Sequence, residues 1–337
     1  MSENDMDWAA VGAHLARHGL TLLPGERPRF PGGFANRNYR VDLASGPAVL
    51  RRPPPGPLPR GAHDMAREHL ILSRLPDRLG FVPRSLHLCE DESVIGVKFQ
   101  LLEYREGVVI HGVLPAEYAG CGGELSEMLL ATLAAINSVD TNALGLGGLG
   151  RPEGFLARAV EGWLKRGAAA DAGPILDELG RWLRAHAVPD GAPGLLHNDF
   201  KLDNLILDPV TLRPNAVVDW DQGTRGDSVF DLATLLSYWV QPDDPQVMHD
   251  LHQMPTAGDG FITREAAARR WGELTGRDVS DIRFHRVLAT LKLSVIFLQL
   301  HGLWRRGATA DARYARFGAL GQGLLEFAAD IAAGRSF

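Results

Sequence analysis

Four polar residues in one short segment have the types and the spacing that phosphoryl transfer requires. His197, Asp199 and Asn204 form a His-x-Asp-x-x-x-x-Asn pattern, and Asp219 follows a short apolar run. In this chemistry one carboxylate accepts the proton of the attacking hydroxyl. An amide oxygen and a second carboxylate hold Mg²⁺ against the nucleotide phosphates. The segment 195–220 therefore carries the clearest chemical signal in the sequence.

Each residue of this set has an expected role. Asp199 is the candidate base, which would orient the acceptor hydroxyl in line with the γ-phosphate. Asn204 and Asp219 are the candidate Mg²⁺ ligands, because their hard oxygens suit that ion. His197 is expected to brace the loop by hydrogen bonds. Any one carboxylate or amide alone would more commonly cap a turn. The functional interpretation is favoured because Asp199, Asn204 and Asp219 occur together with the required spacing.

The elements that must position these residues divide the chain into two parts. The first part is predicted to be rich in strands and the second to be mainly helical. The predicted strands are 30–43 (two strands around a turn), 48–52, 84–89 and 94–104. The predicted helices are 7–18, 63–79, 125–137, 155–166, 175–187, 230–239, 265–275, 282–306 and 310–333. The interlobe join is predicted near 104–107. Residues 145–150 match G-x-G-x-x-G but follow a helix, so they are interpreted as loop.

Composition limits the kinds of partner and the location. The chain has 337 residues, 45% of them hydrophobic, and a net charge of −6. An acidic chain of this kind gives no support for nucleic acid or an anionic membrane as a partner. The two cysteines suggest no disulfide framework. The polar N-terminus does not resemble a signal peptide, and no apolar run was expected to reach transmembrane length. We therefore expect a cytoplasmic protein.

Two motifs give the sequence a family resemblance. The segment HNDF at 197–200, with Asn204, and the segment VVDWD at 217–221 resemble the aminoglycoside phosphotransferase-like kinase family. The resemblance is closest to the kinase-like domain branch of certain acyl-CoA dehydrogenases. Further similar segments are 32–36, 49–54, 147–152, 226–227 and 231–233. The resemblance implies an α+β, bilobal, protein-kinase-like fold with ATP between the lobes. The small antiparallel-sheet lobe would be 1–105 and the larger helical lobe 106–337.

The resemblance also indicates a nucleotide-binding set in the first lobe. Gly32 and Gly33, with Asn36, lie in a predicted turn where backbone N–H groups can approach phosphates; the alternative is a plain hairpin turn. Arg51 occupies the place where kinases have a phosphate-binding lysine, and Glu68 is its candidate partner. Arginine is permanently charged and binds phosphate or carboxylate with two parallel bonds. Arg52 would point to the other face of the strand.

Five further residues have implied roles. By likeness to a hinge strand, the backbones of Glu103 and Arg105 would bind the adenine edge, although an ordinary connection fits the same residues. Asp221 either contacts a second metal ion or caps a turn, and the sequence favours neither. Asp227 and Asp231 are expected to support the catalytic region by hydrogen bonds.

The acceptor should be a small molecule that carries a hydroxyl group and binds to the helical lobe. Its candidate contacts are Tyr238, Trp239, Asp243, Asp244, Gln299, His301 and Trp304. The helix 282–306 is rich in basic residues, which would suit an anionic acceptor, but a solvated basic face is the preferred interpretation. The implied activity is an ATP- and Mg²⁺-dependent small-molecule kinase. The alternative is a non-catalytic nucleotide-binding module. A protein kinase ranks third, because little chain separates Asp219 from Gly226.

Overall fold

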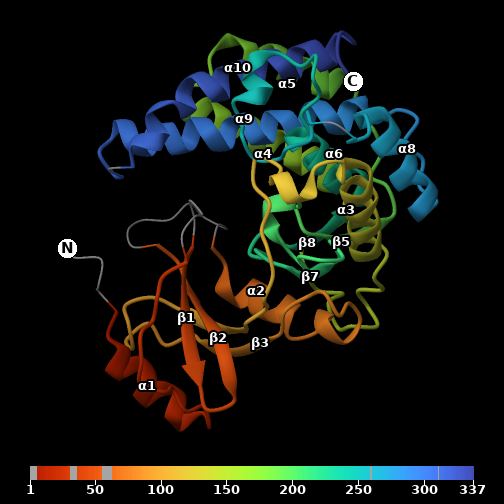
Figure 1. The fold of residues 1–337 in the computed structure, drawn as a ribbon. Helices are drawn as coiled ribbons and strands as arrows, with labels where there is room; N and C mark the ends of the chain where they lie inside the picture. Colours follow the sequence, from red (N-terminus) through yellow and green to blue (C-terminus); the bar gives the residue numbers. More distant parts are fainter. Residues whose placement is uncertain (1–5, 31–35, 55–62, 259, 310) are drawn as a thin grey trace. The chain divides into compact units, whose positions relative to one another are not determined.

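A computed structural model describes the chain except residues 1–5, 31–35, 55–62, 259 and 310 (Figure 1). The predicted glycine turn at Gly32 and Gly33 therefore lies outside the described residues. Two compact units are present. The N-terminal unit comprises 1–108, 142–146 and 206–223, and the C-terminal unit comprises 109–141, 147–205 and 224–337. The first change of unit lies close to the predicted join, but both units are discontinuous, whereas the sequence suggested one contiguous division after residue 105.

The N-terminal unit contains a four-stranded antiparallel sheet in the order β1-β2-β4-β3. Its elements are α1 (Trp8–Arg17), β1 (Arg37–Leu43), β2 (Gly46–Arg52), α2 (Met65–Leu72), the 3₁₀ turn η1 (Leu75–Asp77), β3 (Ser85–Cys89) and β4 (Phe99–Glu103). The predicted helix 63–79 is shorter than expected. It ends at Leu72 and is followed by a 3₁₀ turn that contains Pro76, because proline lacks the N–H that an α-helix interior needs.

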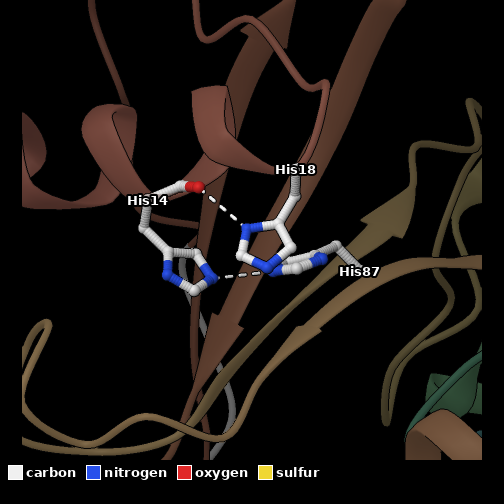
Figure 2. Close-up of side chains that lie close together, drawn as sticks. All are labelled: His14, His18 and His87. Carbon is white, nitrogen blue, oxygen red and sulfur yellow. Dashed lines mark hydrogen bonds between the residues drawn. The ribbon is translucent and has the colours of Figure 1, made fainter.

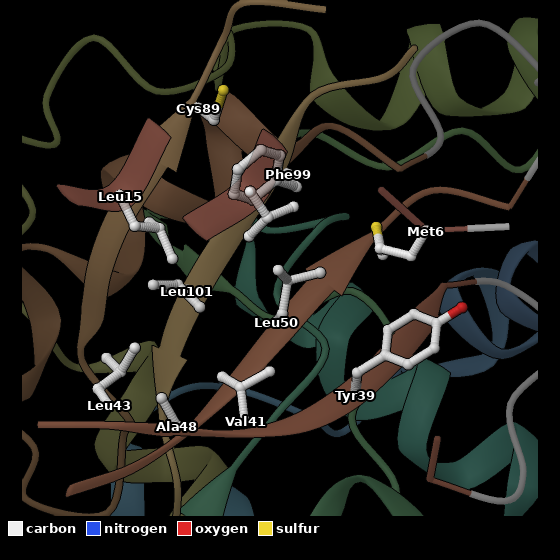
Figure 3. Packing of buried hydrophobic residues seen from close by; sticks show 11 residues of the cluster. Met6, Leu15, Tyr39, Val41, Leu43, Ala48, Leu50, Cys89, Phe99 and Leu101 are labelled. Carbon is white, nitrogen blue, oxygen red and sulfur yellow. The ribbon is translucent and has the colours of Figure 1, made fainter. Parts of the chain in front are cut away.

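An apolar core joins α1 to this sheet (Figure 3). Leu15 of α1 is fully buried, as are Val41, Leu50 and Leu101 from three different strands. Alternate residues of β1 and β2 point into the core, as expected for strands with one covered face. This packing fixes the strand that carries Arg51.

The segment 206–217 also belongs to the N-terminal unit. Strands β6 (Leu205–Leu207) and β7 (Pro214–Val217) form a two-stranded sheet. The backbones of Val108 and Leu207 exchange two hydrogen bonds of 2.9 and 2.8 Å, and Val217 N–H donates to the Phe81 carbonyl at 2.8 Å. These backbone bonds, between residues far apart in sequence, explain why the unit is discontinuous.

The C-terminal unit is mostly helical. Its elements are the 3₁₀ turn η2 (Ala116–Tyr118), α3 (Gly122–Asn137), α4 (Phe155–Ala169), α5 (Pro174–Ala185), β5 (Pro193–Leu196), η3 (Leu202–Asn204), β8 (Thr224–Asp227), α6 (Ser228–Tyr238), α7 (Gln246–His249), α8 (Arg264–Thr275), α9 (Arg283–Arg305), η4 (Ala312–Ala315) and α10 (Phe317–Ala332). Strands β5 and β8 pair antiparallel. The predicted α+β class, with an N-terminal antiparallel sheet and many helices, is confirmed.

Helix α9 lies within one residue at each end of the predicted helix 282–306, but it is more apolar than expected, and the expectation that no apolar run reaches transmembrane length is wrong for it. Its mean hydropathy of 1.5 over 18 residues meets the length and composition criteria for a membrane span. However, 61% of that window is buried inside the structure, and α9 packs against α4, α6 and α10. Burial of this extent is typical of the central helix of a helical core.

Candidate active site

Asp199 lies in the loop that follows β5, and two side chains hold its carboxylate. Tyr238 Oη donates a 2.7 Å hydrogen bond to Asp199 Oδ1. Asn204 Nδ2 donates to the Asp199 carbonyl at 2.8 Å and to Oδ2 at 3.3 Å. Neither bond uses the amide oxygen of Asn204, which is the atom predicted to bind Mg²⁺. The structure thus brings the predicted base and one predicted metal ligand together.

A buried carboxylate supports the same loop from behind. Asp231 of α6 is fully buried and accepts hydrogen bonds from the backbone N–H groups of His197 and Asn198, at 2.9 and 2.7 Å. Asn137 Nδ2 donates to Asp231 at 3.0 Å and to the Leu195 carbonyl at 2.9 Å. Asn198 has a φ of +68°, a left-handed conformation that needs such support in a non-glycine residue.

Two further residues that were expected to give support are His197 and Asp227. His197 is fully buried, and its Nδ1 accepts a 3.3 Å hydrogen bond from Asp199 N–H. Asp227 caps α6 through Val229 N–H at 2.9 Å and also accepts from Gly191 N–H at 2.9 Å. His285 lies against Asp227 at 3.3 Å. His197 thus braces the loop at Asp199, as expected, whereas Asp227 stabilises the start of α6 and the segment before β5.

Lys292 is a supporting residue that sequence reasoning did not identify. It projects from α9, its side chain is buried, and its Nζ donates to the carbonyl and to Oδ1 of Asn198, the latter at 2.9 Å. Burial lowers the pKa of Lys292 to about 8, although Asp199 and Asp231 act in the opposite direction. The solvated basic face predicted for the helix 282–306 would include Lys292, His285 and Arg286. That interpretation is wrong for all three residues, because the structure buries them.

The pKa of Lys292 predicts a pH-dependent stability. Because the folded-state pKa lies below the ordinary value of 10.5, the unfolded chain holds this proton between about pH 8 and pH 10.5 while the folded chain has released it. The free energy of unfolding of the wild type should therefore rise relative to Lys292→Met in that window. The expected slope is roughly 1.4 kcal/mol per pH unit. Urea unfolding at several pH values measures it.

The exposed residue Lys165 provides the control for the loss of one lysine, as Lys165→Met. A constant difference between wild type and Lys292→Met from pH 7 to pH 11 would contradict the predicted titration.

In the N-terminal unit, Arg51 links two carboxylates. Its Nε donates to Glu68 Oε2 at 2.8 Å, and its Nη2 forms an ion pair with Asp219. Arg51 is 5% exposed and Glu68 is fully buried. The expected pair of Arg51 with Glu68 is therefore present. Arg52 lies near Met6, at 4.0 Å from its sulfur, rather than in this cluster.

Glu68 also connects the helix α2 to the segment that carries Asp219. Trp220 N–H donates to Glu68 Oε1 at 3.0 Å, and Gln100 Nε2 donates to Oε2. Burial raises the pKa of Glu68, and the positive charge of Arg51 opposes this effect. Asp219 itself has a φ of +70°, in the left-handed region. A non-glycine residue in this conformation is a common feature of functional turns.

Asp221 completes the cluster. Its carboxylate lies 4.0 Å from Arg51 Nη2 and accepts a 3.1 Å hydrogen bond from Asn36 Nδ2. His63 Nδ1 lies 2.9 Å from Asn36 Oδ1. Burial, and then repulsion from Asp219, raise the pKa of Asp221 well above its usual value. Three carboxyl groups thus surround one guanidinium, and carboxyl oxygens are the ligands that suit a divalent cation such as Mg²⁺.

The two hinge residues have local partners. Glu103 N–H donates to the Arg84 carbonyl at 2.8 Å, and the Glu103 carboxylate accepts from Arg84 N–H at 3.0 Å. Arg105 Nε lies 3.0 Å from Glu103 Oε1. The amide of Glu103 is thus part of the sheet, and adenine binding by these residues stays a prediction.

Two of the proposed acceptor contacts serve the internal structure instead. Trp239 is fully buried and donates from its indole to the Ile262 carbonyl at 3.0 Å. The side chain of Asp244 is 3% exposed and forms an ion pair with Arg264 at 2.5 Å. Tyr238 differs, because its hydroxyl contacts Asp199 directly.

The predicted residues thus form two groups. Arg51, Glu68, Asp219 and Asn36 belong to the N-terminal unit, and Asp199 and Asn204 belong to the C-terminal unit.

Comparison with known proteins gives consistent matches. Residues 26–271 match the model of the phosphotransferase enzyme family. The chain is 30% identical over 326 residues to acyl-CoA dehydrogenase family member 10 of Mus musculus. The aligned region covers 93% of this chain but only 30% of the mouse protein. The chain therefore spans about a third of the length of this relative.

Solved structures share the fold. A presumed aminoglycoside phosphotransferase from Ralstonia eutropha superposes with a TM-score of 0.78 and 23% identity, covering 98% of this chain and 99% of the other. A thermostable mutant of aminoglycoside phosphotransferase APH(4)-Ia, in ternary complex with AMP-PNP and hygromycin B, gives a TM-score of 0.58 and 18% identity, covering 96% and 99%. The expected aminoglycoside phosphotransferase-like, kinase-like fold is confirmed.

Proposed function

Because the chain belongs to the phosphotransferase enzyme family, we propose that it transfers the γ-phosphoryl group of ATP to a hydroxyl group of a small molecule. The observation that carries this proposal is the carboxylate of Asp199, which Tyr238 and Asn204 hold in a fixed orientation. A fixed carboxylate next to an amide oxygen is what a phosphotransferase needs to accept a proton beside a bound metal ion.

Each residue has a defined part in the proposed reaction. Asp199 accepts the proton of the acceptor hydroxyl as its oxygen forms a bond to the γ-phosphorus. The bond from that phosphorus to the β–γ bridging oxygen breaks, and ADP leaves. Arg51 contacts the phosphates, and Glu68 orients it. Asn204 and Asp219 would hold Mg²⁺, which when bound neutralises the charge of the phosphate oxygens.

The choice of nucleotide and acceptor has separate support. The complex with AMP-PNP and hygromycin B belongs to a protein of the same fold, so a nucleoside triphosphate and a small hydroxylated molecule are the classes to test. The acidic composition of the chain, with a net charge of −6, gives no reason to add a nucleic acid to these classes.

A screen of hydroxylated metabolites tests the proposal. ADP formation from ATP and Mg²⁺ is measured for each metabolite, with Asp219→Ala as the matched background. We expect at least one metabolite to raise ADP formation in the wild type alone, because Asp219 is the proposed metal ligand. If the wild type binds ATP but consumes none above the Asp219→Ala background with any acceptor, the chain is a nucleotide-binding module and the proposed catalysis is wrong.

A further inference from the structure

A cluster of three histidines lies in the N-terminal unit, among residues that the proposed phosphoryl transfer does not use. His14 and His18 come from α1 and its C-cap, and His87 comes from β3 (Figure 2). One nitrogen atom from each ring lies within 4.8 Å of the other two. The rings of His14 and His18 have centroids 4.4 Å apart, and both lie about as close to His87, at 5.1 and 4.7 Å.

Local structure explains why the rings converge. His14 and His18 are four residues apart, so they project from the same face of the helix, one turn apart. Leu15 anchors this helix in the core that also contains Leu101 of β4, the strand paired with β3. The packing thus presents two imidazoles to the third.

Hydrogen bonds define which ring nitrogen each histidine can offer. His18 Nδ1 lies 2.9 Å from the His14 carbonyl oxygen, so it carries the proton and leaves a lone pair on Nε2. His14 Nδ1 faces Cys89 Sγ at 3.9 Å, and His14 Nε2 faces His87 Nε2 at 2.9 Å. An imidazole N–H bound to a backbone carbonyl is the usual support of a metal-binding histidine.

The charge state of the rings is compatible with metal binding. Burial, together with the neighbouring imidazoles, lowers the pKa of His87 to about 4. The pKa of His14 is also lowered, mainly by burial, although Asp91 acts in the opposite direction. Neutral imidazole is the form that donates a lone pair to a metal ion.

We propose that His14, His18 and His87 bind a divalent transition-metal ion, with zinc as the probe. Three imidazole ligands suit zinc, copper or nickel rather than magnesium or calcium, which prefer oxygen. In a tetrahedral zinc site with bonds of 2.0–2.1 Å, ligand nitrogens lie about 3.3 Å apart. The two facing nitrogens at 2.9 Å need to separate by only a few tenths of an ångström.

The ion would connect α1 to β3, while water fills the remaining coordination position. Cys89 does not belong to the ligand set, because its sulfur contacts the opposite nitrogen of His14 and the Asp91 carbonyl. Such an ion would stabilise the folded N-terminal unit by mass action.

Zinc titration of the full chain by calorimetry, in excess Mg²⁺ to occupy oxygen sites, tests the proposal. We expect one zinc ion per chain. His18→Gln is the informative variant, because His18 is exposed and its loss should not prevent folding. The substitution should weaken zinc binding by at least about tenfold. A loss of about tenfold is the lower end of what is seen when a residue that only hydrogen-bonds to a metal ligand is removed, and His18 is proposed as a ligand itself. His87→Gln should do the same. Zinc should also raise the melting temperature of the wild type.

His186 provides a closely matched control. It also caps a helix, α5, and its Nδ1 lies 2.9 Å from the carbonyl of the residue four positions earlier, Trp182. His186→Gln should therefore keep wild-type zinc affinity. The visible spectrum of bound Co²⁺ should show tetrahedral coordination in the wild type and in this control only.

Two results would overturn the proposal. One is zinc affinity that is the same in the wild type, His18→Gln and His87→Gln. The other is a wild type that binds no zinc, in which case the close approach of His14 and His87 is an ordinary hydrogen bond. Neither result bears on the proposed phosphoryl transfer, which uses other residues.

Discussion

Replacement of Asp199 by asparagine is expected to lower kcat for phosphoryl transfer by about 10²–10⁴-fold, the range attributed to a positioned general base. An amide cannot accept the hydroxyl proton, but it keeps the size of the side chain and can still accept the hydrogen bond from Tyr238. Nucleotide affinity should change little, because Asp199 is not among the proposed phosphate or adenine contacts. Steady-state kinetics with the acceptor found in the screen, together with ATP titration, measures both quantities.

Asp203→Asn is the control for Asp199→Asn. Asp203 lies in the same loop and forms an ion pair with Lys201 at 2.8 Å, so the substitution removes a nearby carboxylate without removing the proposed base. Its kcat should stay within a few-fold of the wild type. Equal losses of kcat in the two variants would indicate a general electrostatic role for the loop and would contradict the assignment of Asp199 as the base.

Replacement of Arg51 by methionine is expected to reduce the free energy of unfolding by about 3–5 kcal/mol, as is typical when one partner of a buried ion pair is removed. Glu68 is fully buried and would keep a carboxylate without its counter-charge. Asp219 would lose the same partner. Urea unfolding of the full chain measures the change, and the variant should also bind ATP more weakly.

Two further variants distinguish the effect of breaking the buried ion pair from the effect of losing an arginine side chain. Arg184→Met removes an exposed pair with Glu161, whose Nε–Oε1 distance is also 2.8 Å, and should destabilise the fold far less than Arg51→Met, because water screens an exposed ion pair. In the double variant Arg51→Met/Glu68→Gln, the buried charge is removed together with its partner. This double variant should be more stable than Arg51→Met alone. Equal destabilisation by Arg51→Met and Arg184→Met would contradict the argument.

The hydrogen-bonded loop around Asp199 could be predicted from sequence because its parts are close in the chain. Asn204 lies five residues after Asp199, and the hydrogen bond between them closes within one short turn. The pairing of Arg51 with Glu68 was also accessible, since the strand and the helix are each recognisable by their periodicity. The roles of these residues in binding nucleotide and metal stay predictions.

Lys292 and Tyr238 could not be placed in the same way. Lys292 lies 94 residues after Asn198, and Tyr238 lies 39 residues after Asp199. Only the packing of α6 and α9 brings these side chains to the loop. A lysine in a long helix is usually solvated, so its charge suggested a surface position. Burial of a charge is decided by tertiary contacts that no local pattern encodes.

The histidine cluster could be predicted only in part from the sequence. The spacing of His14 and His18 is visible in the sequence, and it predicts a shared helix face. His87 joins them only through the pairing of β3 with β4 and the docking of α1 on the sheet.

The interleaving of the two units has a consequence for fragments of the protein. The chain passes between the units five times, after residues 108, 141, 146, 205 and 223. A polypeptide ending at residue 108 would lack Trp220 and Asp219, which bind Glu68 and Arg51. Such a fragment should fold poorly alone and recover its structure when the missing segment is supplied on a second polypeptide. The N-terminal unit therefore cannot be taken from the chain as one continuous piece.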